Sequence, residues 1–328
     1  MNFTSEDIVN DLYWILTSTT SLPDLYTKRC GGFRNEKEIE ELLHEKGYQQ
    51  IDGGQLIFVK KNENSEMNKI FYYTVSNDNI TNYGNLYTQL SQMDEIERLF
   101  FIKVHSDEWG RTDIKVKNTK GQVSTRSILK PNFSVHEFSN GEWRYSSFDE
   151  IKNEMSAKRE SVCKVKDPAT LDYMKEWNTD ELSKIYCNRY VLDVELNLFK
   201  KNMMDFDSMI INEGNYIAIE SKEKDPIGKW VKCIDANGME EETIENDTSK
   251  WAFGWDTRRY AWYNYLKTRT GLDTWYLVRE VEHQRRRNLV GWKKISIDDF
   301  SKCSVWHFER QSSRGSTIES SYDAFEDF

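Results

Sequence analysis

The stretch Asp205-Phe-Asp-Ser-Met-Ile-Ile-Asn-Glu-Gly-Asn-Tyr-Ile-Ala-Ile-Glu-Ser-Lys222 decides how this chain is expected to fold. It contains two apolar runs, residues 209–211 and 216–219, separated by a polar turn around Gly214. Glycine in a polar turn between two runs of β-forming residues is typical of a β-hairpin. The stretch therefore predicts two short antiparallel strands.

The register of this hairpin brings acidic side chains together. Pairing the last residue of the first run with the first residue of the second puts Asp207 opposite Glu220. Two residues further from the turn, Asp205 falls opposite Lys222. Because strand side chains alternate between faces, we expect all four side chains on one face and the isoleucines of the second run on the other.

Two facing carboxylates need a cation between them. Opposed side chains have Cβ atoms about 4.5–5.5 Å apart, and like charges at that distance are destabilising. Hard divalent ions such as Mg2+ bind carboxylate oxygens and usually keep several waters. A lysine on the same face can orient an attacking water or stabilise charge that develops on a phosphate.

An acid followed, about a dozen residues later, by Glu-x-Lys resembles the catalytic motif of the PD-(D/E)XK nucleases. The matching residues are Asp207, Glu220 and Lys222. The resemblance implies a restriction-endonuclease-like fold in which the two acids bind Mg2+ and the lysine assists the attacking water. Asp205 would then tune the lysine or serve as a secondary ligand. The motif lies in the hairpin alone, while the order of elements resembles the family over roughly residues 170–300.

Members of that family often carry a further acid on the helix before the first strand, where it completes the metal shell. Glu181 is the best placed for this role, and Glu176 is next. An ordinary surface glutamate is the alternative interpretation for either residue.

The hairpin also has an interpretation without catalysis. In a chain that is 30% charged, an acid followed by Glu-x-Lys occurs by chance. The same residues would then form the solvated face of an ordinary strand pair, and an exposed Asp205–Lys222 ion pair would contribute little.

Composition limits the class of protein. The 328 residues are 38% hydrophobic and 13% aromatic, which is enough to bury sizeable cores. No apolar run approaches the length of a membrane span, so we expect no membrane association. The five cysteines are scattered without C-x-x-C spacing, which favours a reducing, cytoplasmic location and argues against a zinc site.

The net charge of −10 argues against a nucleic-acid partner, but a binding groove needs only a local basic stripe. Basic residues gather in the last third of the chain. Arg258 and Arg259 begin a predicted helix, residues 256–267, where an arginine could contact a phosphate. Arg285, Arg286 and Arg287 lie at the tip of a predicted charged hairpin and suit a backbone contact. Solvated helix and hairpin surfaces are the alternative in both places.

The order of predicted elements gives an α/β (α+β) protein with mixed sheets. We expect an N-terminal α/β domain over residues 1–160, which supplies target recognition, and a nuclease domain over 161–310. A Ser-rich, acidic tail, residues 311–328, is either disordered or docked through its aromatic residues. Within the second domain we expect a helix at 171–186, a strand at 190–199, a polar loop at 228–250 and a strand at 274–281.

These features predict a Mg2+-dependent endonuclease that cuts double-stranded DNA, most like a type II restriction endonuclease. Cutting both strands of a duplex requires two sites, so we expect a homodimer. The alternatives are a nuclease acting on RNA, branched DNA or modified DNA, and a non-catalytic nucleic-acid-binding module of the same fold. A further alternative is an α/β scaffold without a nucleic-acid role, which the acidic charge favours.

Overall fold

The structure is a computed structural model of the whole chain, and it describes residues 3–18, 23–60, 68–117, 122–153, 168–196, 203–234, 239–283, 287–306 and 316–328. It divides the chain into two compact units. The first unit comprises Met1–Lys37 and Ile51–Asp205, and the second comprises Glu38–Gln50 and Phe206–Phe328. The mixed α/β class expected from the sequence is confirmed. Among the described residues, no helix is long and apolar enough to cross a membrane.

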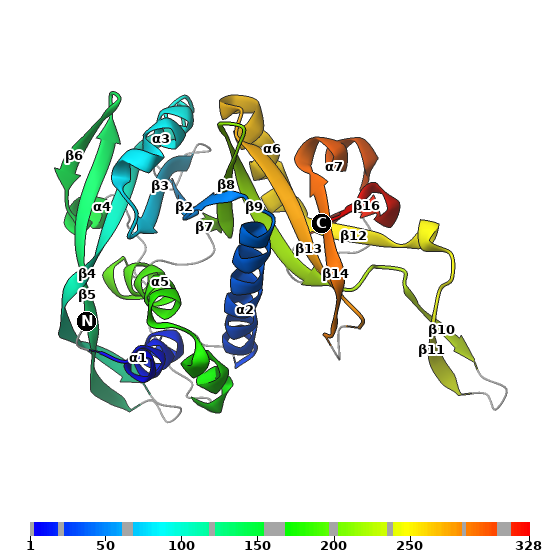
Figure 1. Cartoon of the computed structure of the whole chain (residues 1–328), viewed down its shortest axis with the longest axis horizontal. Helices are drawn as coiled ribbons and strands as arrows, with labels where there is room; N and C mark the ends of the chain where they lie inside the picture. The colour runs from blue at the N-terminus through cyan, green and yellow to red at the C-terminus, as the bar shows by residue number, and fades with distance from the viewer. Residues whose placement is uncertain are drawn as a thin grey trace. The chain divides into compact units, whose positions relative to one another are not determined.

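The first unit is built around a six-stranded sheet with the order β6-β5-β4-β3-β2-β7 (Figure 1). Strands β3 and β4 are parallel, and the other neighbouring pairs are antiparallel. The strands are β2 (Gly54–Lys60), β3 (Asn68–Ser76), β4 (Ile96–Lys117), β5 (Val123–Ser139), β6 (Glu142–Ser146) and β7 (Met203–Asp205). The helices are α1 (Ser5–Ser18), η1 (Ile80–Tyr83), α3 (Gly84–Leu90), α4 (Phe148–Asn153), η2 (Pro168–Glu176), α5 (Thr179–Tyr190) and η3 (Val191–Glu195).

Strand β3 is buried on both faces, which explains its nearly continuous apolar sequence. Phe71 and Tyr73 pack on one side in a cluster that includes Leu192 of η3. On the other side, Tyr72 meets Tyr87 of α3 edge to face, with ring centroids 5.4 Å apart. The sheet thus has helices on both faces.

The strand predicted at residues 190–199 is wrong. Tyr190 ends α5, and Val191–Glu195 form a π-helical turn instead. Val191 and Leu192 are buried in the core of the first unit, so tertiary packing overrides their β propensity. Residues 161–205, which were assigned by sequence to the nuclease domain, lie in the first unit by this division of the chain. The buried Tyr186 packs in one cluster with Leu12 of α1.

The second unit contains a six-stranded sheet with the order β1-β8-β9-β13-β14-β17. Strands β8 and β9 form the antiparallel hairpin, while β9 and β13 run parallel. The sheet strands are β1 (Gln49–Ile51), β8 (Ser208–Asn212), β9 (Asn215–Lys224), β13 (Asp273–Val281), β14 (Leu289–Ser296) and β17 (Glu326–Asp327). Smaller sheets hold β10 (Trp230–Ile234), β11 (Glu240–Ile244), β12 (Ala252–Asp256), β15 (Ser304–Trp306) and β16 (Thr317–Ser321). The helices are α6 (Thr257–Thr270), α7 (Ile297–Cys303), η5 (Thr248–Lys250) and η6 (Tyr322–Ala324).

Helix α2 (Pro23–Glu45) begins in the first unit and ends in the second. In the second unit its buried Ile39 and Leu43 pack on Ile217, Ile219 and Leu277 of the large sheet. The apolar face that the sequence predicted for the hairpin is therefore covered by a helix from far upstream. This packing leaves the alternate residues of β9 to face α6.

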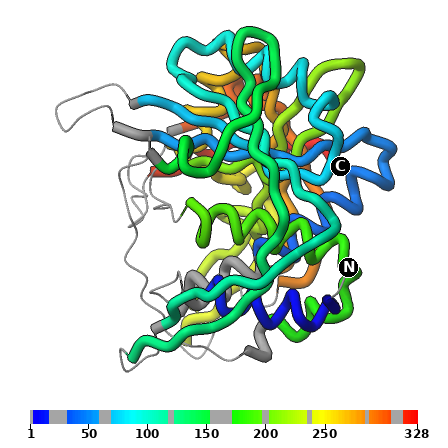
Figure 2. Tube along the Cα trace, turned by 90° about the vertical axis from the view of Figure 1, so that its left-hand side faces the viewer, coloured from blue at the N-terminus to red at the C-terminus, as the bar shows by residue number. Residues whose placement is uncertain are grey.

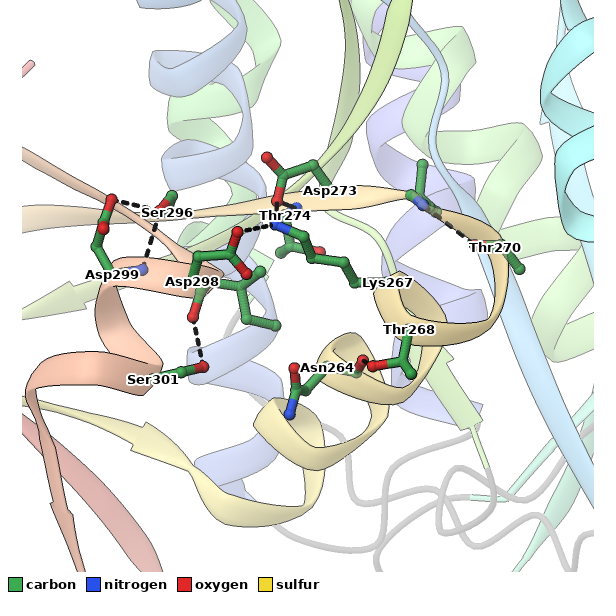
Figure 3. A network of polar contacts seen from close by, with 12 residues as sticks. Asn264, Lys267, Thr268, Thr270, Asp273, Thr274, Ser296, Asp298, Asp299 and Ser301 are labelled. Carbon is green, nitrogen blue, oxygen red and sulfur yellow. Dashed lines mark hydrogen bonds and ion pairs between the residues drawn. The ribbon is translucent and has the colours of Figure 1, made fainter.

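Helix α6 and strand β13 confirm their predictions. Asp256 caps the helix, accepting a hydrogen bond from the Arg259 N–H at 3.0 Å, and Gly271 ends it in the left-handed conformation at φ 72°. Lys267 joins Asp273 at 2.9 Å and Asp298 at 2.6 Å, which ties α6 to β13 and α7 (Figure 3).

Two irregular segments predicted from the sequence contain more structure than expected. The loop predicted at 228–250 carries the two-stranded ribbon β10–β11.

The tail is docked in its described part. Strand β16 pairs with β12, Phe325 is buried, and Phe328 stacks on Tyr48 at 6.1 Å. Of the two alternatives for the tail, docking through aromatic residues is confirmed there.

Candidate functional site

The hairpin register predicted from the sequence is confirmed from Ser208 to the turn. Ile211 pairs with Tyr216, and the two-residue turn consists of Glu213 at φ 50° and Gly214 at φ 81°. Two successive positive φ angles are typical of a type I′ turn, whose twist matches that of the strands it joins. The turn chemistry and the apolar pattern thus specify the same register.

Glu220 is the centre of the site. It lies on β9 and is fully buried, with 0% of its surface exposed. Its Oε2 atom accepts hydrogen bonds from Arg259 Nη1 at 2.6 Å and from the Tyr263 hydroxyl at 2.9 Å. These two residues are four apart on α6, so their side chains leave the same face of the helix. These donors replace the water contacts that the carboxylate loses on burial.

Lys222 lies two residues along the same strand and faces the same way. Its ammonium nitrogen is 2.6 Å from Glu220 Oε1 and donates a hydrogen bond to the Ser221 carbonyl at 2.8 Å. Burial lowers the pKa of this lysine, but the carboxylates of Glu220 and Asp207 outweigh burial and raise it overall. The side chain is 35% exposed, so Lys222 is a cation with access to solvent.

Asp207 departs from the predicted pairing. The β8–β9 ladder ends at Ser208, and the Asp207 N–H donates to the carbonyl of Ile219 at 3.1 Å. The side chain reaches across the strand pair, where Oδ2 accepts hydrogen bonds from the Ser221 N–H at 2.7 Å and from its hydroxyl at 2.8 Å. Asp207 is therefore not directly opposite Glu220, although its carboxylate acts on the same lysine.

Asp205 is not part of this hairpin, and the prediction that it pairs with Lys222 is wrong. It ends β7, which pairs with β2 in the sheet of the first unit, so that Asp205 lies opposite Gln55. The chain changes sheets at Phe206, which the alternation of side chains along a single strand could not reveal.

Glu181 also belongs to the first unit, where its carboxylate has a structural role. It forms a capping box at the start of α5, accepting from the Asn178 N–H at 3.2 Å while Asn178 caps the Glu181 N–H. Its other oxygen pairs with Lys37 at 2.8 Å. Glu176 lies in η2 of the same unit. The second unit, which contains the Glu-x-Lys strand, therefore holds neither of these acids.

The five arginines predicted to contact nucleic acid differ in their exposure and in their partners. Arg259 binds Glu220 and is 27% exposed, whereas Arg258 is exposed at the start of α6. Arg287 pairs with Glu223 at 2.7 Å and is 60% exposed. Arg285 and Arg286 lie outside the residues that the structure describes.

Lys224 is a neighbour of the site that sequence reasoning missed. It continues the alternation of Glu220 and Lys222 along β9 and donates a hydrogen bond to the Gly254 carbonyl. Burial, followed by the charge of Lys222, lowers the pKa of Lys224 to about 8. Alternation along the strand was the signal that could have identified it.

A pocket of about 360 Å³ lies at the end of β9, beside Lys224. Two basic and two acidic side chains line it together with apolar residues. The lining consists of Glu223, Lys224, Asp225, Ile227, Val281, Arg287 and Thr317. It is a polar pocket in the immediate neighbourhood of the Glu-x-Lys strand.

Asp207 and Glu220 are the carboxylates of this site that could hold a metal ion. No group of three or more His, Cys, Asp or Glu side chains that could hold a metal occurs among the described residues. A Mg2+ site does not require three protein ligands, because one or two protein carboxylates and several waters usually hold this ion. Glu220 Oε1 is buried and pairs with the Lys222 ammonium at 2.6 Å. A carboxylate oxygen can accept more than one contact, so a cation could share this atom with the lysine. The oxygens of Asp207 and Glu220 are of the type that Mg2+ binds.

Comparisons with protein-family models, with curated proteins and with solved structures found no match to this chain.

Proposed function

We propose that this chain is a Mg2+-dependent endonuclease of the PD-(D/E)XK type that hydrolyses DNA phosphodiester bonds, most like a type II restriction endonuclease. The observation that carries the proposal is the buried Glu220, held between Lys222 and Arg259 with Asp207 acting on the same lysine. Burying a charged group costs several kcal/mol, and perturbed, clustered charges are a feature of functional sites.

The order of elements supports the proposal. The end of α2 precedes the hairpin β8–β9, and α6 and then β13 follow it. This is the helix, antiparallel hairpin, helix and strand expected of the restriction-endonuclease-like fold. Most of the first unit, Ile51–Asp205, lies in the sequence between β1 and β8, and the first unit is the proposed target-recognition part.

Each residue of the site has a proposed role. Asp207 and Glu220 would hold Mg2+, which would act as a Lewis acid on the phosphate and lower the pKa of an attacking water. Lys222 supplies a positive charge that orients the water and stabilises the charge developing on the phosphate. Tyr263 fixes the Glu220 carboxylate, and Arg259 is a second cation available to the phosphate.

The proposed partner is double-stranded DNA, and the proposed assembly is a homodimer, because one site cuts one strand. We also propose a cytoplasmic location. Cys187, Cys233 and Cys303 are free thiols in the described part of the chain, as a reducing compartment requires.

A non-catalytic nucleic-acid-binding module is the second candidate. Both oxygens of Glu220 already have cationic neighbours, Lys222 and Arg259, and such an ion-pair cluster can stabilise a fold without chemistry. The two candidates differ in whether a Mg2+-dependent product forms.

The test is incubation of the purified protein with unmethylated duplex DNA of phage size, in Mg2+ and in EDTA. Discrete fragments that require Mg2+ would support a sequence-specific endonuclease. A parallel panel of RNA, branched DNA and base-modified DNA distinguishes the other nuclease classes. Salt-dependent binding without any product on the whole panel would favour the non-catalytic module.

A further inference from the structure

Strands β4 and β5 continue as a two-stranded ribbon beyond the sheet of the first unit. Strand β3 accompanies β4 only as far as Lys103. After a register shift between His105 and Gly110, residues 110–117 of β4 pair with 123–130 of β5 alone. Figure 2 shows these two long strands running past helix α1. A β-bulge at such a point bends and redirects a strand pair.

One face of the ribbon packs on the protein. Ile114 and the buried Ile128 join a core cluster with Leu12 and Ile15 of α1. Val116, two residues beyond Ile114, is also buried. This face anchors the ribbon and gives it a fixed conformation, which an isolated strand pair would lack.

Apart from the buried Leu129 at its start, the opposite face is polar and exposed. Asp113 lies opposite Ser127, and Lys115 lies opposite Thr125, with all four residues exposed. Short hydroxyl, carboxylate and ammonium groups in cross-strand pairs give an ordered pattern of hydrogen-bond donors and acceptors. Lys115 has no acidic partner among the residues that the structure describes.

The ribbon is strongly basic in an acidic chain. The sequence from Gly110 to Lys130 holds six basic residues and one acidic residue, a local charge of +5, whereas the whole chain has a net charge of −10. Such a contrast concentrates attraction for a polyanion on one element.

The dimensions suit the major groove of DNA. Eight residue pairs at about 3.3 Å each give a ribbon roughly 26 Å long. The major groove is about 12 Å wide and admits a two-stranded β-ribbon, and serine, threonine, aspartate and lysine can all bind base edges there.

We propose that the exposed face of this ribbon binds in the major groove of duplex DNA. Lys115 contacts a phosphate, and Asp113, Thr125 and Ser127 face the base edges. This inference rests on the proposed function for its class of ligand and names the element that recognises the target.

The test measures binding of a fluorescent random-sequence 30-bp duplex by anisotropy, in Ca2+, with Glu220→Gln present in all proteins so that no cleavage interferes. The variant Lys115→Ala should weaken binding about 3- to 10-fold and lower the salt slope by about 0.9. Arg144→Ala is the matched control, because Arg144 is exposed on β6 of the same sheet. It should leave affinity within about twofold.

Sequence readout is tested separately. Selection of bound duplexes from a random pool should return a different preferred sequence for Thr125→Ala/Ser127→Ala than for the protein with both hydroxyls. Unchanged affinity, salt slope and selected sequence in these variants would overturn the proposal. A change in sedimentation of the protein alone, with DNA binding intact, would also overturn it and assign the ribbon to contact with a second copy of the chain.

The two proposals can fail independently. Ribbon-dependent binding by a protein that never cuts would retain the ribbon proposal and refute the nuclease. Cleavage by otherwise wild-type protein that is indifferent to Lys115→Ala would retain the nuclease and refute the ribbon.

Discussion

Replacing Glu220 with glutamine should destabilise the second unit, because this carboxylate is the shared counter-ion of two cations. Glutamine keeps the shape and can keep the Tyr263 hydrogen bond. It loses the charge that faces Lys222 and Arg259, each with a nitrogen 2.6 Å from a carboxylate oxygen. The substitution therefore tests the effect of the negative charge while the side-chain volume stays nearly constant.

The size of the effect follows from burial. Removing one member of a buried ion pair costs about 3–5 kcal/mol when the other member stays buried. Here the cations are 35% and 27% exposed and can regain part of their hydration. We therefore expect the free energy of unfolding to fall by about 2–3 kcal/mol, which lowers the melting temperature by roughly 5–10 °C.

The assay is hydrogen exchange of the β9 backbone amides at pH 7, which reports on the second unit specifically. Glu240→Gln is the control for an exposed ion pair, since Glu240 and its partner Lys232 are 67% and 66% exposed, and it should change stability by less than about 0.5 kcal/mol. A double-mutant cycle with Arg259→Gln should give a coupling energy of about 2 kcal/mol. Unchanged or increased stability of Glu220→Gln, or a coupling energy near zero, would refute this account of the site.

Two further predictions concern the same unit. The pKa of Lys224 is lowered to about 8, so the folded state binds this proton less tightly than the unfolded state, and protonated Lys224 costs stability below pH 8. Lys224→Met should thus raise the free energy of unfolding at pH 7 by at most roughly 3 kcal/mol. Urea titrations should show this difference from the wild type shrinking as the pH rises from about 8 to about 10.5. A difference that is independent of pH would contradict the lowered pKa of Lys224. Leu43→Ala should cost about 2–5 kcal/mol in the same urea assay, because Leu43 is fully buried against the second sheet, and a loss below 1 kcal/mol would mean that α2 does not cover that sheet.

The sequence predicted the hairpin well because its signals are local. The turn around Gly214 and the alternating apolar pattern both act over a few residues, and the structure has the predicted pairing of Ile211 with Tyr216. Helix α6 could be predicted equally well, since Asp256 and Gly271 mark its ends. Local capping and turn chemistry are encoded where they act.

The remaining differences come from long-range packing. Nothing near Asp205 in the sequence indicates that β7 pairs with β2, about 150 residues upstream. The same holds for α2, whose Ile39 and Leu43 cover a sheet formed mainly by residues after 206. Glu181 is a similar case, because its helix α5 packs with α1 in the first unit, a contact that no neighbouring sequence signal indicates.

The most direct test of the central claim is Mg2+-dependent DNA cleavage by two matched variants. Glu280 is the control for Glu220, because it is also buried, lies on the neighbouring strand β13, and pairs with Lys229 and Tyr322. Glu220→Gln should reduce the rate at least about 10²–10³-fold, while Glu280→Gln should retain activity wherever it remains folded. Cleavage by Glu220→Gln at the wild-type rate would contradict the account.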